Sequence, residues 1–319
     1  MSPELTGGLI ALLVPLCFGT GTVLARAGLV HVPAGAGNFL SLVTGWVLIA
    51  SITAVLYPDA LFGITLGTFG WLAMIGVVNF PGGRFLNFVS IKHLGILRAN
   101  PILAMAPIVS AFEGVFFLDE QLNWAIATGT LLAVMGLIIV VYGEVSARGG
   151  RVPQPAAPAP APGAKRPGLI ERHPRVFGYI AAAGAACAYG TVPALGRVAV
   201  TDFAIPLVSA TYTMLVGFIV MGLFSAGSIP GMLRNAPRRS LVLVALGGAA
   251  MSTGVSFLYL ALSKAPVIVV SPVFSLTAVV SLVLAHIFLQ RLERITFPLV
   301  LGTSFAVGGV IVVIIGTQV

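Results

Sequence analysis

The chain has 319 residues, of which 58% are hydrophobic and 8% are charged, and its formal net charge is +8. Soluble domains carry about 25% charged residues, so this composition excludes an ordinary water-soluble protein. Lipid must be the solvent for most of its surface.

Apolar stretches of about 20 residues, long enough to cross a bilayer, occur ten times. They cover residues 5–28, 36–57, 69–91, 96–118 and 124–142, and then 176–200, 205–224, 241–262, 266–289 and 297–316. We therefore predict an all-α integral membrane protein with ten transmembrane helices. Only Glu4 is charged before the first apolar run, so we expect a retained span rather than a signal peptide.

The two halves of the chain repeat each other at an offset of about 171–173 residues. Phe18-Gly19-Thr20 recurs as Tyr189-Gly190-Thr191, and Phe85-Leu86 recurs as Phe257-Leu258. Because each copy holds an odd number of spans, the copies must be inverted relative to each other, as in many transporters. We predict two five-helix repeats, over residues 1–146 and 176–319, around a central cavity.

The segment between the repeats, residues 147–175, is predicted to be a Pro/Ala-rich basic linker. Of the 17 Lys and Arg residues, fourteen lie on the linker side of the expected spans, Arg197 and Lys264 lie opposite, and Arg84 lies within a span. Cytoplasmic loops are enriched in Lys and Arg. This predicts a cytoplasmic linker and both termini outside the cytoplasmic (inner) membrane, and nucleic-acid binding is not needed to explain the charge.

Three ionisable residues lie deepest within the predicted spans: Arg84, Glu113 and His286. Such residues are costly in hydrocarbon and usually face a cavity or a partner. Arg84 and Glu113 align with Ser256 and Leu284, so the repeat does not duplicate their charges. We predict that Arg84 binds an anionic or carbonyl group of the substrate and that Glu113 couples transport to a proton or cation.

An internal ion pair between Arg84 and Glu113 is the alternative. The two residues differ in predicted depth by roughly 12 Å at 1.5 Å per residue, which disfavours a direct pair. Neutral side chains that can form hydrogen bonds within the spans are further substrate-binding candidates, together with His286. They are Asn79, Asn87, Asn100, Tyr189 and Tyr259.

Two kinds of small or rigid residue recur between the repeats. Pro101 and Pro272 occupy equivalent places and are candidates for gating hinges, or for the first helical turn, which tolerates proline. Glycines seven residues apart occupy one helix face in the last span of each repeat. For these glycines, Gly129 with Gly136 and Gly302 with Gly309, we expect a packing role.

Motifs for catalysis are missing from the sequence. It contains no nucleotide-binding glycine loop, no His/Cys spacing for a metal and no nucleophile motif. We therefore expect no catalytic residues, no metal, no cofactor and no enzymatic activity. The two cysteines, Cys17 and Cys187, lie within spans, where small packing residues are expected rather than a disulfide framework.

These features together resemble EamA-type members of the drug/metabolite transporter superfamily. The resemblance rests on the five-plus-five spans, the aromatic-Gly pair in the first span of each repeat, and the closing acidic loop, here residues 117–122. That loop usually reads Leu-Gly-Glu-Arg, and Asp119 stands here in place of the glycine. The resemblance implies a basket-shaped bundle whose cavity is lined by spans one, three, four, six, eight and nine. It also implies cytoplasmic termini, opposite to the charge distribution.

The leading hypothesis is a secondary active transporter for a small metabolite, an amino-acid-like compound or a drug, driven by a proton or by exchange against a counter-substrate. A flippase for a lipid-linked head group is the alternative, and would need a laterally open groove. A membrane-embedded enzyme would need clustered catalytic groups, which the sequence does not offer. We expect membrane lipids and the small-molecule substrate as partners, no nucleic acid, and a monomer or weak homodimer.

Overall fold

A computed structural model describes residues 2–29, 31–87, 89–90, 102–103, 105–147, 174–288 and 297–317. All regular elements within these residues are helices, which confirms the predicted all-α class. The first half contains α1 (Pro3–Ala11), α2 (Leu13–Gly28), α3 (Ala34–Leu56), α4 (Pro58–Phe62), α5 (Leu66–Val77), the π-helical η1 (Val78–Phe85), α8 (Ala106–Phe117) and α9 (Trp124–Ala147). The second contains α11 (Pro174–Val198), π-helical η2 (Ala199–Phe203), α12 (Pro206–Ser225), α13 (Ile229–Asn235), α14 (Arg238–Leu262), α15 (Val267–Ser275), α16 (Thr277–Phe288) and α17 (Phe297–Gly316).

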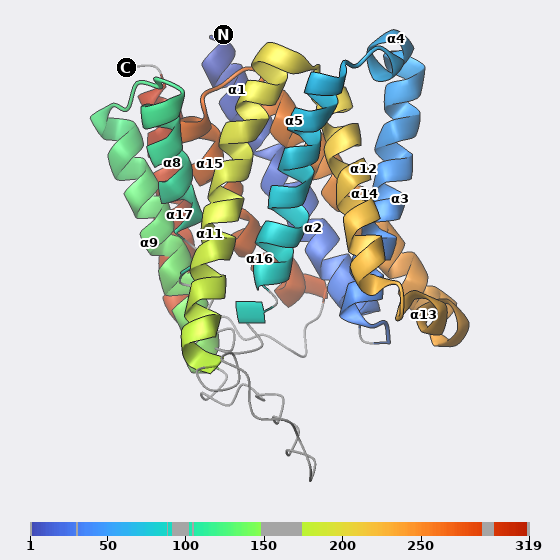
Figure 1. Ribbon diagram of the computed structural model, residues 1–319. Helices are drawn as coiled ribbons and strands as arrows, with labels where there is room; N and C mark the ends of the chain where they lie inside the picture. The colour runs from blue at the N-terminus through green and yellow to red at the C-terminus, as the bar shows by residue number, and fades with distance from the viewer. Residues whose placement is uncertain are drawn as a thin grey trace.

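The two halves cross the bundle in opposite senses (Figure 1). Both chain ends lie on one face, which we call the terminal face. Helix α9 ends at Ala147 and α11 begins at Pro174 on the opposite face, which we call the linker face (Figure 1). The first half therefore runs from the terminal to the linker face and the second half runs back, as inverted repeats require.

Five described helical stretches are long and apolar enough to cross a membrane: Pro3–Ala25, Gly35–Leu56, Val176–Phe203, Pro206–Ser225 and Arg238–Leu262. Three shorter apolar helices accompany them, at Ala106–Phe117, Trp124–Ile139 and Val300–Gly316. Large apolar side chains on many of these helices are exposed on the outer surface, as a lipid-facing surface requires. The chain is therefore a multi-pass membrane protein, while the count of ten spans stays a prediction.

Helices α9 and α17 pack closely through the glycines that recur between the repeats. A Cβ added to Gly129 would lie 2.6 Å from the Gly309 carbonyl oxygen, and one added to Gly309 would lie 2.5 Å from the Gly129 carbonyl oxygen. A Cβ on Gly136 would likewise lie 2.5 Å from the carbonyl oxygen of Gly302. Only glycine allows backbones this close, which confirms the packing role predicted for these residues.

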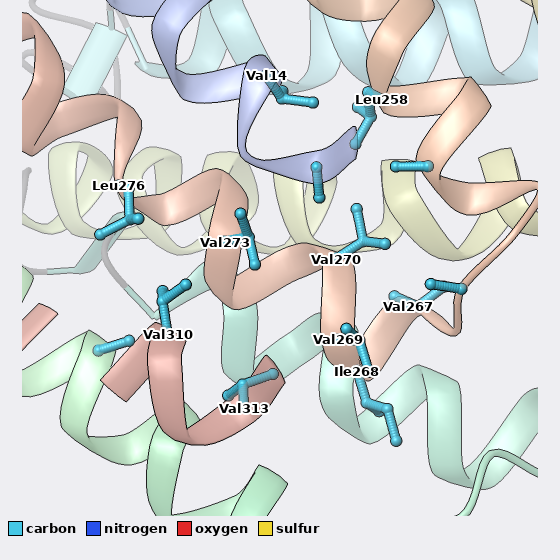
Figure 2. Packing of buried hydrophobic residues seen from close by; sticks show 14 of the residues in the cluster. Val14, Leu258, Val267, Ile268, Val269, Val270, Val273, Leu276, Val310 and Val313 are labelled. Atoms are coloured by element: carbon cyan, nitrogen blue, oxygen red, sulfur yellow. The ribbon is translucent and has the colours of Figure 1, made fainter. Parts of the chain in front are cut away.

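The largest buried apolar cluster surrounds the first half of α15 (Figure 2). Val267, Val270 and Val273 are fully buried, and Ile268 is 1% exposed. Side chains from both halves pack around them, among them Val14 of α2 and Val313 of α17 (Figure 2). A helix buried on all sides reads as a nearly continuous apolar run, which is what the α15 sequence shows.

Candidate substrate-binding cavity

A cavity of about 460 Å³ lies between the helices of the two repeats. Pockets for small organic ligands have volumes of about 300–1,000 Å³, so the size fits such a ligand. The lining is mainly apolar, with Phe18, Phe80 and Phe274 as its aromatic groups other than tyrosine. The polar lining side chains are Thr22, Ser41, Asn79, Arg84, Asn87, Ser110, Tyr189, Ser252, Tyr259, Ser271, Ser275 and Thr277.

The helices that line the cavity only partly match those implied by the family resemblance. Spans one, three, four, six, eight and nine all contribute, as that resemblance implies. Helices α3, α9 and α12 contribute as well, through Ser41, Leu42, Leu137 and Met214. The lining set implied by the resemblance is therefore incomplete.

Arg84 lines the cavity from η1, which is π-helical and interrupts the continuous α-helix expected over residues 69–91. Pro81 inside this segment has no N–H to donate, so the α-helical hydrogen-bond pattern cannot continue through it. Gly83 gives room to a neighbouring helix, because a Cβ there would lie 2.6 Å from Cε1 of Tyr189. π-Helical turns are rare and frequently occur at functional sites. The Pro81-Gly82-Gly83 sequence is the signal that could have revealed it.

The guanidinium of Arg84 has only neutral partners among the described residues. It donates a hydrogen bond through Nη1 to Oδ1 of Asn38 on α3, and it lies 5.5 Å from the centroid of the Phe80 ring. It also interacts with the hydroxyl of Tyr189 on α11. The sequence did not predict the contact with Asn38, because Asn38 precedes Arg84 by 46 residues and lies near the start of α3.

Several buried polar atoms around the cavity have no hydrogen-bond partner among the described residues. They include Oδ1 of Asn87 and Oγ of Ser271, which line the cavity, and Nδ2 of Asn38 beside Arg84. Buried polar atoms in proteins are nearly always satisfied. Oδ1 of Asn87 and Oγ of Ser271 are therefore free to form hydrogen bonds within the cavity.

The other predicted cavity residues fall into two groups. Asn79, Tyr189 and Tyr259 line the cavity together with Arg84 and Asn87. Tyr189 also interacts with Asn87, and the hydroxyl of Tyr259 lies 2.9 Å from Oγ1 of Thr213. The remaining candidates lie outside the described part of the chain: they are Asn100, Pro101 and the side chain of His286.

Glu113 is not among the residues that line the cavity. It lies where α8 meets α11, and its Oε1 accepts a hydrogen bond of 2.6 Å from Oγ1 of Thr191. Its Oε2 is buried and has no partner among the described residues. Phe112 and Phe116 on the same helix are 54% and 67% exposed, so Glu113 lies between the outer surface and α11. The alternative of an Arg84–Glu113 ion pair is wrong for this structure, because each residue has a different partner.

Pro272 lies inside α15 rather than in its first turn, which starts at Val267. Its carbonyl accepts a hydrogen bond of 2.6 Å from Oγ of Ser275, and α15 ends there. Helix α16 resumes after Leu276, at Thr277. The first-turn interpretation is therefore wrong for Pro272, and the hinge remains a prediction.

A carboxylate joins the two repeats on the terminal side of the cavity. Glu120, in the loop between α8 and α9, accepts hydrogen bonds from the backbone N–H groups of Val267 at 2.7 Å and Ile268 at 3.0 Å. These are first-turn donors of α15, whose own N-cap residue, Pro266, makes no side-chain cap bond. We call this contact the Glu120 junction.

Arg197 reinforces the Glu120 junction from α11. It donates a hydrogen bond to the carbonyl oxygen of Leu262 at the end of α14, and its charge acts on Glu120. Burial raises the pKa of the Glu120 carboxyl, and the two N–H donors and Arg197 counteract part of that shift. Leu262 and Ala265 are fully buried, so the region around the Glu120 junction is closely packed.

The backbone of Asp119 explains the family preference at this position. Its φ of 52° lies in the left-handed region, where glycine is favoured and Asp and Asn are tolerated. The preceding helix leaves room for this carboxylate at Gly114, where a Cβ would lie 2.6 Å from Oε2 of Glu120 and displace it. Asp119 therefore preserves the loop shape that presents Glu120 to α15.

Inverted helical repeats around a polar cavity, inside an apolar outer surface, are the architecture of a membrane transporter. The chain belongs to the EamA-like transporter family, whose model matches residues 5–142 and 176–315, and so to the drug/metabolite transporter superfamily. These proteins are membrane transporters, not enzymes.

A solved structure titled "Crystal structure of protein" is 18% identical, with a TM-score of 0.72 over 97% of this chain and 96% of that chain, and shares the fold. No curated protein matches the chain.

Proposed function

We propose that this chain is a secondary active transporter that moves a small metabolite, an amino-acid-like compound or a drug across the cytoplasmic membrane by alternating access. The observation that carries this proposal is a cavity between the helices whose polar lining comes from both repeats. In transporters of this kind the substrate binds at the repeat interface near the bilayer midplane, and one repeat rocks against the other.

The proposed substrate contacts are the described candidates that line this cavity: Asn79, Arg84, Asn87, Tyr189 and Tyr259. Asn100 and His286 keep their proposed roles from the sequence. Arg84 supplies the charge, and the amides and hydroxyls supply hydrogen bonds in fixed directions. Pro272, with its equivalent Pro101, is the proposed hinge, because the helix break after it lies beside the cavity-lining residues of α15.

A flippase for a lipid-linked head group is the less favoured function. It would need a polar groove that opens sideways to lipid. The polar lining comes from helices of both repeats, including α2, α11 and α14, which favours a site between the repeats over a groove on one side of the bundle.

The direct test is uptake into liposomes that contain the purified protein. Pooled metabolites are offered to these vesicles and to protein-free vesicles, and the vesicle contents are compared by mass spectrometry. We expect at least one small compound to accumulate only where the protein is present. Equal contents in both preparations, with the protein folded and correctly inserted, would refute the proposal.

We propose Glu113 as the coupling carboxylate, although it lies beside rather than in the cavity. Replacing Glu113 with Gln keeps its shape but removes its titration. We expect Glu113→Gln to abolish uptake driven by a pH gradient while leaving exchange between internal and external substrate intact. Thr191→Val, which removes the hydrogen bond but keeps the carboxyl, should retain coupling. Unchanged pH-driven uptake in Glu113→Gln would remove this residue from the mechanism.

We propose that the linker lies in the cytoplasm and both termini lie outside. The basic residues Arg234, Arg238 and Arg239 lie in α13 and at the start of α14, on the linker face (Figure 1). Short cytoplasmic loops carry such an excess of basic residues. A reporter that is active only outside the cytoplasm should stay silent when fused to the linker, and activity there would reverse the orientation.

A further inference from the structure

The charge among the described residues that line the cavity is positive. Arg84 is the single charged side chain among the described residues that line it. The sequence has nine carboxylates in 319 residues, and none of the described ones is part of the lining. Glu113 faces Thr191, and Glu120 faces the start of α15. The described cavity therefore offers a cation for an anionic group and no carboxylate for a cationic group.

No described residue compensates the charge of Arg84. Asn38 and Tyr189 are neutral, and Phe80 offers only a ring face. A guanidinium has five N–H donors in a planar fork that matches a carboxylate. A partly buried charge without a counter-ion is unfavourable, so an anionic ligand would gain electrostatic attraction from Arg84 here.

The rest of the lining is suited to an apolar ligand body. Phe18 and Phe274 pack edge to face, with ring centroids 5.3 Å apart, and the aliphatic side chains of Val255 and Leu258 lie in the same lining. Oγ of Ser271 and Oδ1 of Asn87 add one or two neutral hydrogen-bonding points. An apolar pocket with a few convergent polar groups binds amphipathic small molecules.

We infer, on the basis of the proposed transport function, that the cavity selects an organic carboxylate with an apolar body and discriminates against zwitterionic and cationic analogues. The carboxylate pairs with the fork of Arg84, while the apolar body lies against the aromatic side of the cavity. A free ammonium group would meet the positive charge of Arg84 without a carboxylate to offset it among the described lining residues. Among small solutes, the expected substrates are therefore organic anions.

Four probes with a common phenylpropyl body test this inference: 3-phenylpropanoate, its neutral amide, 3-phenylpropylamine and phenylalanine. Binding is measured as the ligand-induced rise in the melting temperature of the detergent-solubilised protein. Charge-assisted hydrogen bonds contribute about 1.5–3 kcal/mol, which corresponds to roughly 10- to 150-fold in affinity. We expect 3-phenylpropanoate to bind about 10- to 150-fold more tightly than the other three probes.

Arg84 variants assign the preference to this residue. Arg84→Gln should bind the acid and the amide equally, and Arg84→Lys should retain a reduced preference for the acid. Equal or tighter binding of phenylalanine or the amine to the wild-type protein overturns the inference, as does no binding of any probe. If the Arg84 variants do not fold, the ranking on the wild-type protein still decides. Selective binding of the acid without its movement across liposomes would refute the transport function and leave the site assignment intact.

Discussion

Replacing Glu120 with Ala is expected to open the terminal side of the cavity. The substitution leaves the N–H groups of Val267 and Ile268 without their acceptor, inside a fully packed region. Each unsatisfied buried donor costs about 1–3 kcal/mol. Because Glu120 belongs to the first repeat and α15 to the second, this cost falls on the conformation in which the repeats are joined. The cost of even one such donor shifts a two-state equilibrium by about 5- to 150-fold.

The opening can be measured with a single reactive thiol in the cavity. Ser275 lines the cavity, and the native Cys17 and Cys187 are both free thiols that can be replaced by Ala. In the Ser275→Cys variant, Glu120→Ala should speed labelling by an impermeant thiol reagent from the terminal face, within the same 5- to 150-fold range. Asp119→Gly is the matched control, because glycine suits the φ of 52° and leaves Glu120 in place. Equal labelling rates in both variants would show that the Glu120 junction does not control access.

Replacing Gly309 with Val is expected to destabilise the scaffold rather than the site. The new side chain would run into the backbone of α9, since its Cβ alone would lie 2.5 Å from the Ala133 nitrogen and from the Gly129 carbonyl oxygen. Overpacking typically costs about 1–3 kcal/mol, and backbone contacts relax less easily than flexible side chains. We expect a lower melting temperature in detergent and a lower yield of folded protein.

The neighbouring glycine supplies the control for this effect. A Cβ on Gly308 would meet no atom within 4 Å. Gly308→Val makes the same change in side chain and in helix propensity, on the same helix, so its melting temperature should stay close to wild type. If both variants lose the same stability, helix propensity rather than the α9–α17 contact explains the loss.

The duplication explains why much of this architecture could be predicted from sequence. Inversion follows from an odd number of spans in each copy, and the paired glycines follow from their seven-residue spacing on a helix face. Arg84, Tyr189 and Tyr259 could be predicted as cavity residues because a charged or hydroxyl-bearing side chain in an apolar span usually faces a cavity or a polar partner. These arguments depend only on residue type and spacing, which the sequence contains.

Other parts of the site depend on tertiary contacts that no spacing reveals. Asn38 reaches Arg84 from another helix, and Glu120 meets Val267 across 147 residues. Glu113 was expected at the cavity because its helix borders it, yet the rotation of α8 turns this residue toward Thr191. The predicted depths of Glu113 and Arg84 along their helices correctly disfavoured an ion pair between them. Depth does not determine how α8 is rotated about its axis.

Alternating access through the cavity is the central claim, and the Ser275→Cys variant in the cysteine-free background tests it most directly. Purified protein in liposomes is exposed to an impermeant thiol reagent from the terminal face or from the linker face, with and without the transported compound. We expect labelling from both faces, and slower labelling when the compound is bound. Labelling from one face only, under every gradient and ligand condition, would contradict transport through this cavity.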